Sequence, residues 1–338
     1  MINKKEFLDR NVVVTGGLGF LGSNLARKAV ELGAKVTLID TLNPLYGGNY
    51  YNIQGIEDKV TVIINDIRNV EIIEPIIKKA DIIFHFAAQV SYIDSLSMPN
   101  EDYNLNAQST LIILELCRKH NPKAKIMFAS SRMVLGNVEG GTMTEEIIPN
   151  PLSLYGIHKL TSEKYLGMYY KDFGIPYVVL RITNPYGLRQ QIKHNKYSLV
   201  GWFVRQAMED KEISIFGTGS QLRDYIYSED IINAFILCAV SEKAVGQIVN
   251  IGSGVSTQFK DMVETVVEVV GKGEIKYIPW PAEYERIETG DIRTDISKLQ
   301  ILTGWKPEYS IKEGILRTYN YYKKFKNFYI TENRNSVQ

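Results

Sequence analysis

Short apolar runs alternate with stretches of helical period through the first half of the chain. The runs predict strands at residues 11–15, 35–39, 60–64, 82–86, 125–129 and 177–181. The helical stretches predict helices near residues 20–32, 70–78, 101–120 and 155–173. This alternation is typical of an α/β fold with a doubly wound parallel sheet and right-handed crossovers. We therefore expect the strand ends at Phe86, Ser130 and Ile182 to open on the ligand side of the sheet.

From about residue 185 the alternation becomes irregular, which favours a second, smaller unit of mixed structure. The later pattern predicts helices at 229–240, 258–270 and 311–325, and a strand at 247–251 that rejoins the sheet. The expected organisation is a first domain of residues 1–184 plus about 229–254, a second of 185–228 and 255–328, and a polar tail at 329–338.

A glycine-rich turn separates the first strand from the first helix. Its sequence, VVVTGGLGFLG at 12–22, places glycines at Gly16, Gly19 and Gly22. Such a turn lets backbone approach a pyrophosphate at the positive end of a helix dipole, although it also occurs for tight packing alone. The next strand ends in Asp40, and an acidic residue there suits the ribose 2′-hydroxyl of NAD and repels the 2′-phosphate of NADP. The pattern therefore predicts bound NAD.

Composition narrows the class of protein without identifying it. The 338 residues are 45% hydrophobic and carry a formal net charge of +1, so no broad field favours nucleic acid or an anionic membrane. Cys117 and Cys238 give neither a disulfide framework nor a zinc spacing. The N-terminus lacks a signal-peptide core, and no apolar run reaches bilayer length. We expect a cytoplasmic protein without a metal.

A Tyr-x-x-x-Lys pair, Tyr155 and Lys159, lies on the helix predicted at 155–173. Residues four apart share a helix face, and a nearby ammonium lowers the pKa of a phenol. The preceding strand ends in Ser130 and Ser131. Taken singly, such a pair is compatible with packing, and such serines with turns. The order of glycine turn, acidic strand end, serine and Tyr-x-x-x-Lys favours a catalytic set.

Together, the motifs resemble those of the extended short-chain dehydrogenases/reductases, within the NAD-dependent nucleotide-sugar epimerase/dehydratase family. They are TGGLGFLG (15–22), Asp40, Asp66-Ile67, HFAAQ (85–89), Asn106, SSRMVLG (130–136), YGIHK (155–159), LRITNPYG (180–187), GTGSQLRDYIY (217–227) and NIGSG (250–254). The resemblance runs from Val12 to about residue 325. It implies a Rossmann-type sheet, a smaller C-terminal substrate domain and a homodimer formed through helices 101–120 and 155–173.

The resemblance also implies roles for individual residues. The catalytic set is Ser131, Tyr155 and Lys159, in which Tyr155 is the base. NAD is bound by Gly16, Gly19, Phe20, Leu21, Gly22, Asp40, Asp66, Ile67, Ala87, Ala88, Asn106, Tyr155 and Lys159. The nucleotide sugar is bound by Gln89, Ser131, Arg132, Asn184, Val200, Phe216, Arg223 and Asp291. A second diphosphate arginine of the family falls on Glu288 here, so that Arg286 is the candidate substitute.

The residues after Ser131 bear on the type of reaction. The family's 4,6-dehydratases usually carry Asp-Glu there, to expel water, whereas this chain has Arg132 and Met133. This difference favours an epimerase (isomerase), acting at C4 of a UDP-hexose through a transient 4-keto sugar. The segment LVGWF at 199–203 resembles that of CDP-tyvelose-type 2-epimerases, so epimerisation at C2 of a CDP-deoxysugar is the alternative. A decarboxylase or 4,6-dehydratase, and a non-catalytic NAD sensor, are further alternatives.

Overall fold

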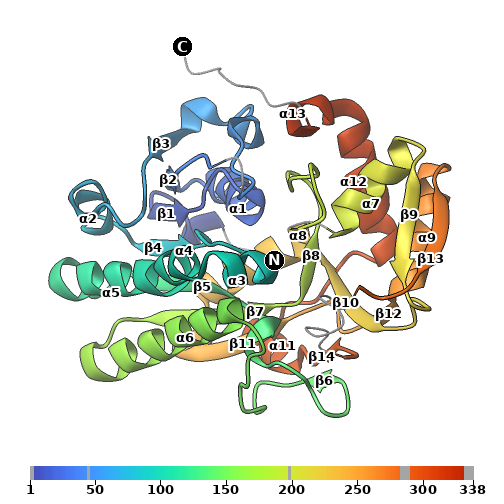
Figure 1. The fold of residues 1–338 in the computed structure, drawn as a ribbon. Helices are drawn as coiled ribbons and strands as arrows, with labels where there is room; N and C mark the ends of the chain where they lie inside the picture. Colours follow the sequence, from blue (N-terminus) through green and yellow to red (C-terminus); the bar gives the residue numbers. More distant parts are fainter. Residues whose placement is uncertain (1–3, 44–45, 197–198, 282–289, 331–338) are drawn as a thin grey trace.

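The largest element of the fold is a seven-stranded parallel sheet (Figure 1). The computed structural model describes residues 4–43, 46–196, 199–281 and 290–330. The sheet order is β11-β7-β5-β4-β1-β2-β3, and every neighbouring pair is parallel. The strands are β1 (Asn11–Thr15), β2 (Lys35–Asp40), β3 (Val60–Ile64), β4 (Ile82–His85), β5 (Lys125–Ser131), β7 (Tyr177–Ile182) and β11 (Gln247–Ile251). The predicted doubly wound sheet is confirmed, and the strand at 247–251 rejoins it.

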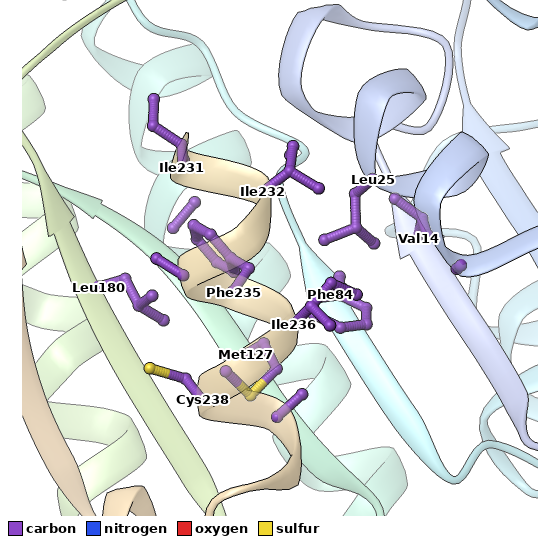
Figure 2. Packing of buried hydrophobic residues seen from close by; sticks show 14 of the residues in the cluster. Val14, Leu25, Phe84, Met127, Leu180, Ile231, Ile232, Phe235, Ile236 and Cys238 are labelled. Atoms are coloured by element: carbon purple, nitrogen blue, oxygen red, sulfur yellow. The ribbon is translucent and has the colours of Figure 1, made fainter. Parts of the chain in front are cut away.

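Helices cover both faces of this sheet. One face carries α1 (Phe20–Glu31) and α8 (Ser228–Val240), and the other carries α2 (Val70–Ile77), α5 (Ser109–His120) and α6 (Leu154–Phe173). Figure 2 shows how α8 lays Phe235 and Ile236 against Phe84 of β4 and Met127 of β5. These side chains are fully buried. The core is therefore continuous across the strands whose carboxyl ends meet at the site described below.

The helix predicted at 101–120 is interrupted. It begins as α4 (Pro99–Tyr103), continues as a π-helical segment (Asn104–Gln108) and ends as α5. A π segment inserts an extra residue into a turn and re-aims the side chains around it, often at a functional site. Asn106 lies at its centre. The sequence pattern predicts a single helix here because apolar positions at helical spacing continue before and after the π-helical segment.

The second part of the chain, together with β6 from the segment after β5, forms smaller sheets beside the carboxyl ends of the large one (Figure 1). A three-stranded sheet has the order β12-β10-β8, and β13-β9 and β14-β6 are two-stranded pairs. Their bounds are β6 (Thr142–Met143), β8 (Asn184–Tyr186), β9 (Glu212–Phe216), β10 (Leu222–Tyr227), β12 (Ser256–Gln258), β13 (Glu274–Ile278) and β14 (Arg293–Thr294). Within the described residues, the other α-helices are α3 (Tyr92–Ser97), α7 (Leu199–Met208), α9 (Phe259–Val270), α11 (Ser297–Thr303), α12 (Ile311–Phe325) and α13 (Asn327–Ile330). Short 3-10 helices lie at Lys4–Glu6, Tyr50–Ile53, Glu57–Lys59, Arg132–Val134 and Glu242–Ala244.

The chain is still packed where the polar tail was expected to begin. Helix α13 spans the expected boundary at 329, and Tyr329 is 2% exposed. The expectation is wrong for residues 329 and 330, because aromatic side chains among polar neighbours dock the helix. None of the described helices combines the length and hydropathy needed to cross a membrane.

Candidate active site

A cavity of about 860 Å³ lies at the carboxyl ends of the parallel strands. Gly16, Ala87, Ser131 and Ile182, which follow or end β1, β4, β5 and β7, line its sheet side. Residues of α7, β9, β10 and the end of β13 line its opposite side. The predicted ligand side of the sheet is therefore where the cavity lies.

Two glycines of the turn have no room for a side chain. Gly16 has φ +67°, and a Cβ there would lie 2.9 Å from the backbone nitrogen of Ala87. A Cβ on Gly22 would overlap the carbonyl oxygen of Gly16. Helix α1 begins after Gly19, whose position as N-cap supplies no side-chain hydrogen bond to the first turn. The exposed backbone and the helix N-terminus fit a pyrophosphate.

Asp40 has a structural task that its sequence position did not reveal. Its Oδ2 accepts the backbone N–H of Leu18 at 2.9 Å, and its Oδ1 accepts that of Leu42 at 2.8 Å. The carboxylate thus ties the glycine turn to the end of β2 while it lines the cavity. Burial raises its pKa. Asp66 also lines the cavity and pairs with Arg68 at 2.6 Å, which lowers the pKa of Asp66.

Ser131, Tyr155 and Lys159 all line the cavity. Tyr155 and Lys159 are 7% and 2% exposed on α6. Burial raises the pKa of Tyr155, and a hydrogen bond with Ser131 opposes that effect. The Lys159 ammonium donates to the carbonyl oxygen of Ala129 at 3.0 Å, and burial lowers its pKa to about 8. The predicted catalytic residues are therefore brought together in a water-poor setting.

A buried ion pair supports this set from behind. Arg181 on β7 donates from Nε and Nη2 to the two carboxylate oxygens of Glu163 on α6, at 3.0 and 2.7 Å. Ser130 Oγ donates to the same carboxylate at 2.6 Å. Glu163 lies one helical turn beyond Lys159, so the pair fixes α6 against β5 and β7. Sequence patterning did not single it out.

Three predicted binding residues do not line the cavity. Gln89 turns back on its own loop, where its amide donates to the carbonyl oxygen of Ser91 at 2.7 Å. Asn106 donates to the carbonyl oxygen of Gln89 at 2.9 Å, behind the cavity wall. Asp291 accepts the backbone N–H of Leu222 at 2.7 Å. Each is a backbone-holding residue here, because its short polar side chain is used by a neighbouring main-chain group.

The other predicted residues among those described do line the cavity. They are Gly19, Phe20, Leu21, Ile67, Ala88, Arg132, Asn184, Val200, Phe216 and Arg223, besides those already described. Asn184 Nδ2 donates to the carbonyl oxygen of Asp224 at 2.8 Å, and Arg223 Nη1 to that of Gly290 at 2.9 Å. Glu288 and Arg286 lie outside the described residues.

Aromatic side chains form the far wall of the cavity, and of these the sequence analysis predicted only Phe216 as a binding residue. Besides Phe216 this wall includes Trp202, Phe203, Phe259 and Trp280. The rings of Phe216 and Trp280 lie 5.5 Å apart, between centroids. Val200 and Phe203 lie three residues apart on one face of α7, and that helical spacing was the signal available for Phe203.

Comparison with known proteins agrees with this geometry. The model of the NAD dependent epimerase/dehydratase family matches residues 12–252. The chain belongs to this family. It is therefore an enzyme, and its cofactor is NAD.

Relatives of this chain span almost its whole length. It is 35% identical to a putative UDP-glucose 4-epimerase of Methanocaldococcus jannaschii, over 92% of this chain and 98% of the relative. It is 28% identical to CDP-paratose 2-epimerase of Salmonella typhi, with the same coverages. The crystal structure of Thermotoga maritima UDP-glucose 4-epimerase with UDP-glucose superimposes with a TM-score of 0.85 at 31% identity, covering 93% of this chain and 99% of that one.

Proposed function

We propose that this protein is a nucleotide-sugar epimerase that inverts C4 of a UDP-hexose. The observation that carries the proposal is the convergence of Ser131, Tyr155 and Lys159 on the cavity that the glycine turn also lines. The similarity of the chain to one putative and one crystallised UDP-glucose 4-epimerase supports the choice of uridine as the nucleoside and of a hexose as the sugar.

The chain's own residues supply the acid–base chemistry. Burial alone raises the pKa of Tyr155, so positive charge beside it is required to form the phenolate that accepts the proton of the sugar 4-hydroxyl and later returns it. Lys159 stabilises that phenolate through its positive charge. Ser131 Oγ accepts the backbone N–H of Met133 at 3.2 Å, and its hydroxyl, which bonds to Tyr155 in this structure, donates to the reacting sugar oxygen when the substrate is bound. When bound, NAD supplies reversible oxidation of the carbon that carries this oxygen.

The glycine turn and Asp40 hold the cofactor, and the far side of the cavity holds the substrate. Arg223 is 8% exposed, and its guanidinium suits a diphosphate. Phe216 and the aromatic wall beside it suit a nucleotide base. The 4-keto sugar turns between these fixed ends before Tyr155 returns the proton.

Arg132 and Met133 support epimerisation over elimination. Arg132 lines the cavity beside Ser131, and its guanidinium remains charged at any working pH. Met133 lines it as well and has no proton to transfer. The pair cannot hand over the protons that loss of water from the 4-keto sugar requires.

A deuterium label tests the reaction type. Purified protein is incubated with UDP-glucose deuterated at C4, and products are analysed by NMR. We expect UDP-galactose that retains deuterium at C4, with no 4-keto-6-deoxy sugar. Migration of the label to C6 would identify a dehydratase, and loss of carbon dioxide from UDP-glucuronate a decarboxylase; either result contradicts the proposal.

A second candidate is epimerisation at C2 of a CDP-deoxysugar. It is favoured by the segment 199–203, four of whose residues line the cavity, and by similarity to CDP-paratose 2-epimerase. The same NMR assay with CDP-paratose separates the candidates, since inversion at C2 would replace inversion at C4. Lack of turnover with UDP-, CDP-, GDP- and dTDP-sugars would contradict both candidates.

We further propose that the chain has two binding domains. Residues 1–184 with 229–254 bind NAD, and residues 185–228 with 255–328 bind the nucleotide sugar.

We also propose that the protein forms a homodimer through α4, α5 and α6. Apolar side chains at Tyr103, Ile157 and Met168 support it, because they are 41%, 43% and 61% exposed.

A further inference from the structure

We propose that Asn52 and Tyr329 are positioning residues for the glycine turn, and that they set how tightly NAD is retained. Neither residue lines the cavity among the described residues. They act through Leu18, which lies inside the turn between Gly16 and Gly19. The inference concerns the cofactor alone and does not depend on the identity of the sugar.

Asn52 joins three separate parts of the chain. Its amide nitrogen donates to the carbonyl oxygen of Leu18 at 2.9 Å and to that of Arg189 at 3.3 Å. Its Oδ1 accepts the hydroxyl of Tyr329 at 2.7 Å. The side chain is fully buried, and all its hydrogen-bonding positions but one lone pair are used. A buried amide satisfied in this way holds one orientation.

The Leu18 peptide is consequently held at both ends. Its N–H donates to the Asp40 carboxylate at 2.9 Å. Its carbonyl oxygen accepts the amide of Asn52 and also the backbone N–H of Asn49 at 3.0 Å. Gly19 and the first turn of α1 follow Leu18 directly, and the backbone N–H groups of Phe20 and Leu21 in that turn are the ones placed to face the pyrophosphate. Asn52 and Asp40 therefore fix the turn from opposite directions.

Tyr329 reaches Asn52 from the other end of the chain. Helix α13, which carries it, follows α12 and lies at the top of Figure 1, beside the blue N-terminal part of the fold. Phe328 stacks on Tyr51 with centroids 3.9 Å apart, and Asn49 Nδ2 donates to the carbonyl oxygen of Phe328 at 2.8 Å. Tyr329 is thereby docked on the 3-10 helix that contains Asn52. The last described helix thus buttresses the cofactor loop.

Removal of the Tyr329 hydroxyl would leave Asn52 Oδ1 buried without that partner. The amide could then turn to find another, at the expense of its bond to Leu18. A more mobile Leu18 would hold the first turn of α1 less well, and with it the N–H groups of Phe20 and Leu21 that face the pyrophosphate. NAD would leave faster even though no residue that touches it has changed.

The test is Tyr329→Phe in the holoenzyme, with Tyr177→Phe as the matched control. Tyr177 is also a buried tyrosine, and its hydroxyl donates to the carbonyl oxygen of Gly246 at 3.2 Å, away from the cavity. The readouts are the rate at which bound NAD exchanges with isotopically labelled NAD, and the thermal unfolding midpoint. We expect Tyr329→Phe to speed exchange by about fivefold, the factor that one ordinary hydrogen bond represents. Tyr177→Phe should lower the midpoint and leave exchange unchanged.

Asn52→Ser provides a second, stronger arm, because serine cannot span from Leu18 to Tyr329. Its exchange should be faster than that of Tyr329→Phe, and adding Tyr329→Phe to it should have little further effect. Equal exchange rates in wild type, Tyr329→Phe and Tyr177→Phe would overturn the proposal. So would additive effects of the Asn52 and Tyr329 changes, since the two residues would then act separately. If Asn52→Ser does not fold, the comparison of Tyr329→Phe with Tyr177→Phe still tests the proposal.

Discussion

At the scale of single residues, Tyr155 is the group on which the proposed chemistry depends most directly. Tyr155→Phe keeps the ring that packs in the cavity wall and removes only the proton carrier. We expect kcat to fall by roughly 10²–10⁴-fold, the usual contribution of a general base. NAD content of the purified protein, measured by absorbance after denaturation, should remain unchanged. Near-normal turnover in this variant would show that another group is the base.

Lys159 gives a prediction about pH. Burial lowers its pKa from an ordinary 10.5 to about 8, so activity should fall as pH rises through about 8 and the charge beside Tyr155 is lost. Between pH 8 and 10.5, Lys159 is protonated in the unfolded chain and neutral in the folded protein. The free energy of unfolding should therefore rise with pH across this range, by up to about 3 kcal/mol. Lys159→Met should lack this rise. Denaturant unfolding of both proteins from pH 7 to 10.5 measures the difference, and parallel curves would contradict the assignment.

At the scale of elements, the glycine turn and α1 form the cofactor end of the cavity. Gly22→Ala should open the turn, because the new Cβ would overlap the carbonyl oxygen of Gly16. We expect NAD affinity, measured by calorimetry, to fall by more than about tenfold, since several backbone contacts are displaced at once. Gly167→Ala on α6 is the control, because its Cβ would meet nothing nearer than 3.6 Å. Both substitutions replace a glycine by alanine within a helix, so their effects on helix propensity are similar. Unchanged NAD affinity in Gly22→Ala would therefore contradict close contact between the turn and the cofactor.

The same scale shows what sequence patterning can predict. The parallel strands were found because each is a buried apolar run between helices long enough to show a period. Strands such as β8 and β14 span Asn184–Tyr186 and Arg293–Thr294, too short for any alternation to register. They are defined by their partners in space, not by their own composition.

For the site, the sequence predicted the positions that are fixed by backbone geometry. Tyr155 and Lys159 share a helix face, and Ser131 ends a strand at the same edge, so all three reach the cavity. Gln89 and Asn106 do not, because a neighbouring carbonyl group captures each amide. Which carbonyl group an amide side chain takes depends on the conformation of the folded loop around it, which the pattern of apolar and polar positions does not contain.

At the scale of the whole molecule, the exposed apolar residues of α6 bear on assembly. Ile157 and Met168 are three helical turns apart and are 43% and 61% exposed, so both lie on one outward face of the helix that carries Tyr155. Charging both positions, as Ile157→Glu with Met168→Glu, should therefore convert the proposed dimer to a monomer, because burying the two carboxylates costs more than the interface regains. Sedimentation velocity measures the mass. Ile301→Glu, on α11 at the opposite face of the sheet and 78% exposed, is the matched control and should leave the dimer intact. A wild-type monomer, or a double variant that keeps the dimer mass, would show that this face has another use.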